Sequence, residues 1–159
     1  MKVVLVSACL LGLRAAYDDR VKAVPPALAA AIAEGRVVPV PVCPEQCGGL
    51  PTPRLPAEIR GGTGDDVLDG RAGVRRIDGA DVTAAFVRGA EDALRLAALV
   101  SPACAVLKER SPSCGVTAVH DGTHSGTLRP GRGVAAAALA RAGVPLFTEE
   151  TAIEALRDL

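Results

Sequence analysis

Short apolar runs alternate with helical patterns along the chain. Lys2–Val6, Arg36–Val42 and Ala103–Leu107 are rich in β-branched or small apolar residues, and this composition predicts buried strands. Asp81–Val100 carries apolar residues at helical spacing and is the clearest helix of the sequence. Strands that alternate with helices in this way indicate a parallel sheet rather than a series of hairpins.

Proline and glycine delimit further elements. Pro25 and Pro26 open a helix over Ala27–Glu34, which Gly35 ends. Pro39 and Pro41 each remove a hydrogen-bond donor from the second strand, so this strand is irregular or lies near an edge of the sheet. The later elements are a short strand, a helix and a final strand, over Val116–His120, Val134–Ala142 and Val144–Phe147.

The middle of the chain is less regular. Cys43–Gly64 is rich in proline and glycine and is predicted to be a long loop, a feature that is usually functional in a compact domain. Val67–Ile77 is interrupted by Gly70 and Gly73 and is predicted to form a small hairpin. The pattern as a whole predicts one domain over residues 1–159, of the α/β class. We expect a small Rossmann-like, open, mostly parallel sheet with helices on both faces.

Charge and composition narrow the function. Lysine plus arginine total 18 and aspartate plus glutamate total 18, and the only aromatic residues are Tyr17, Phe86 and Phe147. A chain of zero net charge with so few aromatic side chains is unsuited to tight nucleic-acid binding, although a small anionic ligand stays open. No apolar run is long enough to span a bilayer and no leader pattern opens the chain, so we expect a cytoplasmic protein without a membrane partner.

Three cysteines follow three predicted strands. Cys9, Cys43 and Cys114 each lie in a loop with glycine, proline or serine neighbours. Because ligands of open parallel sheets bind at the carboxyl ends of the strands, we expect these cysteines to converge on one metal or cluster site. The alternative is that they pack as small apolar side chains. We assign Cys104, which lies inside a predicted strand, to the apolar core. For Cys47 three roles stay open: a fourth ligand, a spare thiol, or a side chain that only fills space.

The ligand type restricts the metal. Sulfur ligands without a nearby histidine suit zinc or an iron–sulfur cluster, and the chain lacks the paired Cys-x-x-Cys knuckles of structural zinc sites. Three protein thiolates on a [4Fe–4S] cluster would leave one iron open to act as a Lewis acid. The residues alone do not decide between these metals.

Three longer motifs resemble the bacterial thiouracil desulfidase family, which was formerly catalogued as a domain of unknown function. The resemblance covers nearly the whole chain. The motifs are Ser7-Ala8-Cys9-Leu10-Leu11-Gly12, Val42-Cys43-Pro44-Glu45-Gln46-x-Gly48-Gly49-Leu50-Pro51-Thr52-Pro53-Arg54, and Leu107-Lys108-Glu109-Arg110-Ser111-Pro112-Ser113-Cys114-Gly115.

The resemblance implies an enzyme. It implies a [4Fe–4S] cluster on Cys9, Cys43 and Cys114 whose open iron binds the sulfur of a thiolated pyrimidine or its nucleotide. Water then replaces the sulfur, and sulfide leaves without net redox change. Glu45 is the matching general acid/base. Ser111 and Ser113 are candidates to hydrogen-bond the attacking water or the base, or else they cap their turn.

The sequence also departs from the family. Ala16 stands where the family usually carries an arginine, and Arg14 is the candidate to replace it. If Cys47 were a fourth ligand, the open iron would be lost. The alternatives to an enzyme are an iron–sulfur redox sensor or sulfur carrier without turnover, and a ligand-binding module with structural cysteines. Tyr17 either stacks on a base or fills the core, and His120 and His124 flank a predicted turn.

Overall fold

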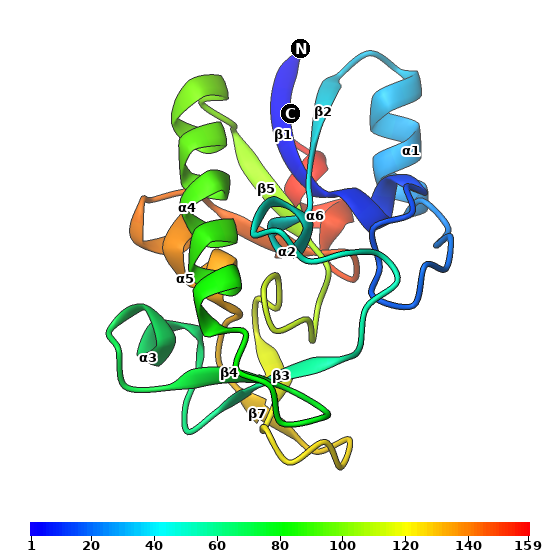
Figure 1. The fold of residues 1–159 in the computed structure, drawn as a ribbon. Coiled ribbons are helices and arrows are strands. Elements are labelled where there is room, and N and C mark those ends of the chain that lie inside the picture. Colours follow the sequence, from blue (N-terminus) through cyan, green and yellow to red (C-terminus); the bar gives the residue numbers. More distant parts are fainter.

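Four parallel strands form the central sheet, in the order β2-β1-β5-β8. The computed structural model describes residues 1–159 (Figure 1). The sheet is built from β1 (Lys2–Ser7), β2 (Val37–Val42), β5 (Cys104–Leu107) and β8 (Leu146–Thr148). The predicted parallel sheet is confirmed, and the proline-containing strand β2 lies at its edge. An edge strand pairs on one side only, so the donors that Pro39 and Pro41 lack are not all needed.

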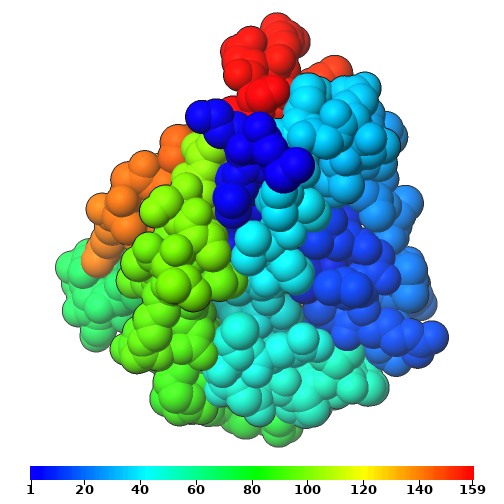
Figure 2. Space-filling view, turned by 90° about the horizontal axis from the view of Figure 1, so that it is seen from above, coloured from blue at the N-terminus to red at the C-terminus, as the bar shows by residue number.

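Helices cover both faces of this sheet, as predicted. Alternate residues of β1 point to opposite faces: Leu5 packs with α4 (Thr83–Val100) and α5 (Val134–Arg141), whereas Val4 and Val6 pack with α1 (Pro26–Ala33) and α6 (Ala152–Leu156). Seen from above, the dark blue start of the chain lies between green α4 and light blue α1 (Figure 2). The sequence reading missed α6. None of the helices is both long and apolar enough to cross a membrane.

Two antiparallel hairpins lie below the sheet in the view of Figure 1. One pairs β3 (Ala57–Arg60) with β4 (Gly73–Arg76), and the other pairs β6 (Ala118–His120) with β7 (Leu128–Pro130). The turn predicted around His120 and His124 connects β6 to β7.

The prediction of a hairpin over Val67–Ile77 is wrong. Its first part belongs to the helix α3 (Gly64–Leu68), because the Asp66 carboxylate accepts a hydrogen bond from the backbone N–H of Thr63 and thereby starts a helix (2.8 Å). Its second part, β4, pairs instead with β3. The predicted loop over Cys43–Gly64 is therefore only partly a loop, since it contains α2 (Pro44–Cys47) and β3.

Two glycines bring α2 into contact with α4. A Cβ atom added at Gly48 would lie 1.9 Å from the Ala85 carbonyl oxygen, and one added at Gly89 would lie 1.9 Å from the Pro44 carbonyl oxygen. Only glycine permits an approach this close. The short helix that follows Cys43 is thus fixed against the longest helix of the fold.

Candidate functional site

One cavity of about 430 Å³ lies at the carboxyl edge of the parallel sheet. Its walls come from the residues that follow β1, β2 and β5, and from β3 and β6 of the two hairpins. Ligands of open α/β sheets bind at this edge, and the volume is typical of a small-molecule site. The three cysteines expected to converge, Cys9, Cys43 and Cys114, all line this cavity.

The three thiols differ in their surroundings. Cys9 and Cys43 are half-buried, whereas Cys114 is only 5% exposed. Burial raises the pKa of the Cys114 thiol to about 12, and burial also raises the pKa of Cys9 although the nearby Lys22 opposes the shift. The Cys43 thiol donates to the Ala15 carbonyl oxygen (3.6 Å). A bound metal would have to displace the protons that burial favours on Cys9 and Cys114.

Glu45 lies inside the cavity rather than in solvent. It is the second residue of α2, and its side chain is 13% exposed. One carboxylate oxygen accepts a hydrogen bond from Arg54 Nε (3.0 Å) and the other accepts one from Ser113 Oγ (2.8 Å). The carboxylate is therefore held at a fixed position among the three cysteines.

The two serines belong to the loop after β5. Ser111 Oγ accepts hydrogen bonds from the backbone N–H groups of Ser113 (3.2 Å) and Cys114 (3.1 Å), so it does cap this turn. Its hydroxyl also lies 3.1 Å from that of Ser113. Ser113 in turn lies 3.7 Å from Cys114 Sγ. A chain of hydroxyl groups thus connects Ser111 through Ser113 to the Glu45 carboxylate.

The start of α5 fixes the same loop. The backbone N–H groups of Gly133, Val134 and Ala136 donate to carbonyl oxygens of the residues 112–115. At Gly133 a Cβ atom would lie 2.5 Å from the carbonyl carbon of Ser113, so the close contact between helix and loop requires glycine there. This packing accounts for the glycine at position 133.

Arg54 is a site residue to which the sequence analysis gave no role. Its side chain is 7% exposed, and besides Glu45 it donates to the carbonyl oxygen of Ala15 (2.8 Å) and to Thr52 Oγ1 (2.9 Å). Nη2 also lies 3.9 Å from Cys43 Sγ. One signal was present in the sequence: Arg54 is the only basic residue in the predicted loop before Arg60.

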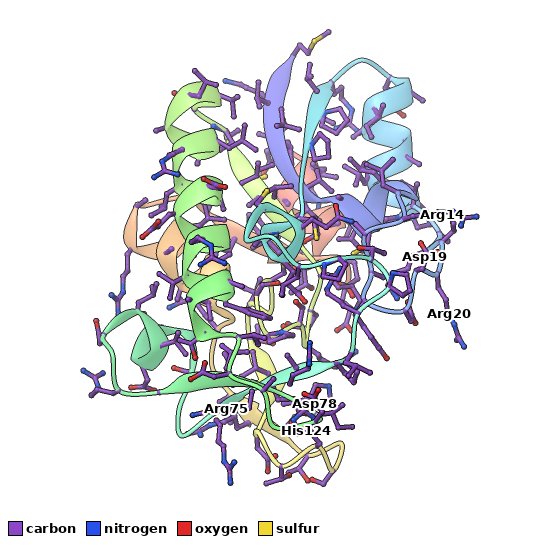
Figure 3. The ribbon with its side chains drawn as sticks, viewed as in Figure 1. Arg14, Asp19, Arg20, Arg75, Asp78 and His124 are labelled. Carbon is purple, nitrogen blue, oxygen red and sulfur yellow. The ribbon has the colours of Figure 1, made fainter.

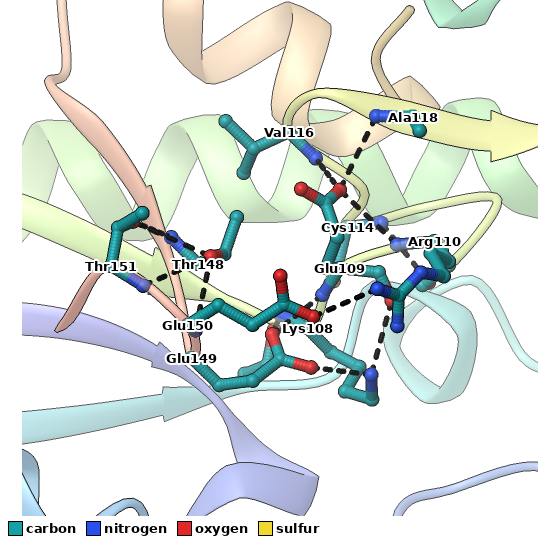
Figure 4. Close-up of polar contacts among 12 residues, drawn as sticks. Lys108, Glu109, Arg110, Cys114, Val116, Ala118, Thr148, Glu149, Glu150 and Thr151 are labelled. Atoms are coloured by element: carbon teal, nitrogen blue, oxygen red, sulfur yellow. Dashed lines mark hydrogen bonds and ion pairs between the residues drawn. The ribbon is translucent and has the colours of Figure 1, made fainter. Parts of the chain in front are cut away.

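Glu109 is a second residue without an assigned role. It is 5% exposed. Its carboxylate accepts hydrogen bonds from Val116 N–H (2.8 Å; Figure 4), Thr117 N–H (3.1 Å) and Thr117 Oγ1 (2.6 Å). Burial alone would raise the pKa of Glu109, but these hydrogen bonds hold it below its ordinary value. Glu109 thus fixes the end of the loop that carries Ser111, Ser113 and Cys114.

Neighbouring carboxylates complete this support. Glu149 accepts hydrogen bonds from the Glu109 backbone N–H (2.7 Å) and from the Lys108 ammonium group, and Glu150 pairs with Arg110 (2.9 Å) (Figure 4). Both follow β8, so the last strand of the sheet also fixes the loop that carries Cys114.

The remaining cysteines lie elsewhere. Cys104 is buried in the core between the sheet and helices α1 and α6, as predicted, and burial raises its pKa to about 11. Cys47 is exposed and does not line the cavity.

Arg14 does not replace the arginine that the family usually carries. Its side chain is 72% exposed and pairs with Asp19 (3.4 Å), and Figure 3 shows both at the outer edge of the molecule. Ala16 lines the cavity wall without a charge. Tyr17 also lines the cavity and is half exposed, so it does not fill the core.

The donors around the cavity fit a [4Fe–4S] cluster. No three metal-binding side chains are grouped closely enough to hold a single ion. Ligands of a cluster bind different irons and so stand further apart than ligands of one ion. The Arg54 guanidinium beside Cys43 is a donor of the kind that stabilises a cluster-bound thiolate.

Comparisons with known proteins agree on one family. The family described as 2-thiouracil desulfurase matches residues 4–151. An uncharacterized Bacillus subtilis (strain 168) protein, YbbK, is 41% identical over 147 residues, which span 92% of this chain and 95% of YbbK. The solved structure of the [4Fe-4S]-dependent thiouracil desulfidase TudS is 42% identical, with a TM-score of 0.85 over 99% of this chain and 97% of TudS.

Proposed function

Because the chain belongs to the 2-thiouracil desulfurase family, we propose that it is a [4Fe–4S]-dependent thiouracil desulfidase, with residues 1–159 acting as one catalytic domain. The observation that carries this proposal is the position of Glu45. A carboxylate held between Arg54 and Ser113, in a cavity lined by three cysteines, supports a role in proton transfer beside a bound metal centre.

Cys9, Cys43 and Cys114 are the residues that would hold the cluster. When bound, the cluster would supply a Lewis-acidic iron suited to a soft thiocarbonyl sulfur. The position of Cys47 outside the cavity supports an assignment with three cysteines.

The protein's own groups handle the water and its protons. Glu45 accepts a proton as water attacks the thiocarbonyl carbon, and the Ser113 hydroxyl, already bonded to Glu45, orients that water. We assign to Ser111 the role of orienting the Ser113 hydroxyl, with which it is within hydrogen-bond distance. The reaction exchanges a C=S bond for a C=O bond and releases hydrogen sulfide. Carbon keeps its oxidation state, so no electron acceptor or donor is needed.

The proposed substrate is 2- or 4-thiouracil, as the free base or as its nucleotide. The cavity wall supplies cations as well as apolar surface, because Lys22 and Arg110 line it together with Tyr17. Such a wall suits either form of the substrate.

Glu45→Gln tests the proposal. The amide keeps the shape of the side chain but cannot exchange a proton, so we expect a full complement of iron and a loss of roughly 10²–10⁴-fold in kcat for sulfide release. The assay follows the thiocarbonyl absorbance and released sulfide after anaerobic reconstitution, with 4-thiouracil and its nucleotide in parallel. Cys47→Ala is the matched control in the same helix.

Two results would count against it. Near-normal turnover in Glu45→Gln would remove Glu45 from the chemistry and direct attention to Ser111 and Ser113. A reconstituted wild-type protein that releases no sulfide from any thiolated pyrimidine would favour the redox sensor or sulfur carrier instead.

A further inference from the structure

The hairpins provide a cavity wall that the proposed chemistry does not use. Pro56, Ala57 and Glu58 lead into and form the start of β3, and His120 ends β6. In Figure 1 these hairpins lie below the main sheet, and the cavity is lined both by them and by the residues that follow the sheet strands, which include the three cysteines. A substrate bound between the two sides would present its sulfur to the cysteines and another part of its ring edge to this wall.

His120 is the polar group of this wall that has no protein partner. Its Nδ1 is buried and makes no hydrogen bond, whereas its Nε2 also has no partner but is not enclosed. A buried N–H without an acceptor is costly, while a buried lone pair costs less. On this ground we assign a ring proton to Nε2, which leaves one N–H of this cavity-lining residue free to donate to a ligand.

Glu58, the other polar residue of the wall, is already occupied. One oxygen accepts hydrogen bonds from the backbone N–H groups of Gly122 (3.0 Å) and His124 (3.1 Å), and the other lies 3.4 Å from His124 Nδ1. Figure 3 shows His124 at the hairpin end of the molecule. Glu58 thus fixes the β6–β7 turn on β3, which holds the strand end that carries His120 in place.

We propose that His120 determines substrate specificity by donating a hydrogen bond from Nε2–H to the oxo group of the thiouracil ring. This inference rests on the proposed function. In both 2-thiouracil and 4-thiouracil the remaining oxo group is meta to the thiocarbonyl. One donor beside the ring therefore serves both isomers, because the oxo group keeps the same position relative to the sulfur in each case. This hydrogen bond uses a ring N–H that has no partner within the protein, whereas the buried Nδ1 stays unpaired.

A pair of substrates tests this contact on the reconstituted enzyme. Pyrimidine-4-thione is 4-thiouracil without the oxo group. We expect wild-type kcat/KM to be about tenfold lower for pyrimidine-4-thione, the usual effect of one lost hydrogen bond. His120→Phe keeps a ring but lacks the donor, so it should process the two compounds with similar kcat/KM. Leu128→Ala is the matched control, because Leu128 pairs with His120 across the hairpin but does not line the cavity.

The outcomes separate the two hypotheses. Equal kcat/KM of the wild-type enzyme for both compounds would overturn the role of His120 without requiring any variant to fold. A tenfold preference that persists in His120→Phe would overturn it as well. Turnover with either result leaves the desulfidase assignment standing, whereas a fully loaded protein that releases no sulfide would refute the proposed function and this inference with it.

Discussion

Removal of the Arg54 side chain should destabilise the protein through the carboxylate that it leaves behind. Arg54→Met keeps much of the apolar stem but removes the guanidinium from Glu45, from the Ala15 carbonyl and from Thr52. With side-chain exposures of 7% and 13%, the Arg54–Glu45 pair is largely shielded from water. Breaking a buried pair by removing one partner costs about 3–5 kcal/mol. We expect the free energy of unfolding to fall by an amount in this range.

A double variant separates the ion pair from general packing. In Arg54→Met/Glu45→Gln neither position of the pair carries a charge. The double variant should therefore be more stable than Arg54→Met alone by at least about 1 kcal/mol. Urea denaturation of the cluster-free protein under reducing conditions, followed by circular dichroism, measures both. The reasoning would be refuted if the single variant lost less than about 1 kcal/mol, because a pair that weak behaves as an exposed one. It would equally be refuted if the double variant were no more stable than the single one.

Two further predictions concern the cluster ligands and the supporting loop. Serine at any one of the three cavity cysteines should abolish iron binding and the brown colour of anaerobic protein, whereas Cys47→Ala should retain both; iron analysis and absorption spectra decide. Glu109→Gln should lower stability at pH 7 by about 1–3 kcal/mol. The pKa of Glu109 in the folded protein lies below its ordinary value of 4.5. The stability difference between wild type and Glu109→Gln should therefore be complete above pH 4.5 and vanish as the pH falls through the folded pKa. Urea titrations at several pH values measure this difference.

The parallel sheet and most of the helices that cover it could be predicted, because these elements have local signals, whereas α6 was missed. Lys2–Val6 is a run of apolar β-branched residues, and Asp81–Val100 keeps helical spacing over its whole length. The hairpin β3–β4 had no such signal, because β3 contains charged residues at two of its four positions and its partner lies beyond an intervening helix. The prediction over Val67–Ile77 failed because it sought a partner too close in sequence.

The candidate site divides in the same way. Convergence of the cysteines could be predicted, since the topology of a parallel sheet brings strand ends together whatever the intervening sequence. The contacts of Arg54 and Glu109 could not, because they depend on how two irregular loops fold against each other. An arginine in a proline-rich loop usually lies in solvent, and only the structure places this one against Glu45 and Cys43.

The strand order has a consequence for synthesis of the protein. The loops that carry Cys9 and Cys43 follow adjacent strands, β1 and β2, which emerge first and can pair as soon as α1 has formed. The loop of Cys114 follows β5, which lies between β1 and β8, and residues after β8 support that loop. Because chains fold from the amino end as they leave the ribosome, two thiols stand ready long before the third is fixed. Cofactor loading is therefore expected to follow synthesis of the segment up to β8 and Glu149, and until then the early thiols depend on a reducing environment.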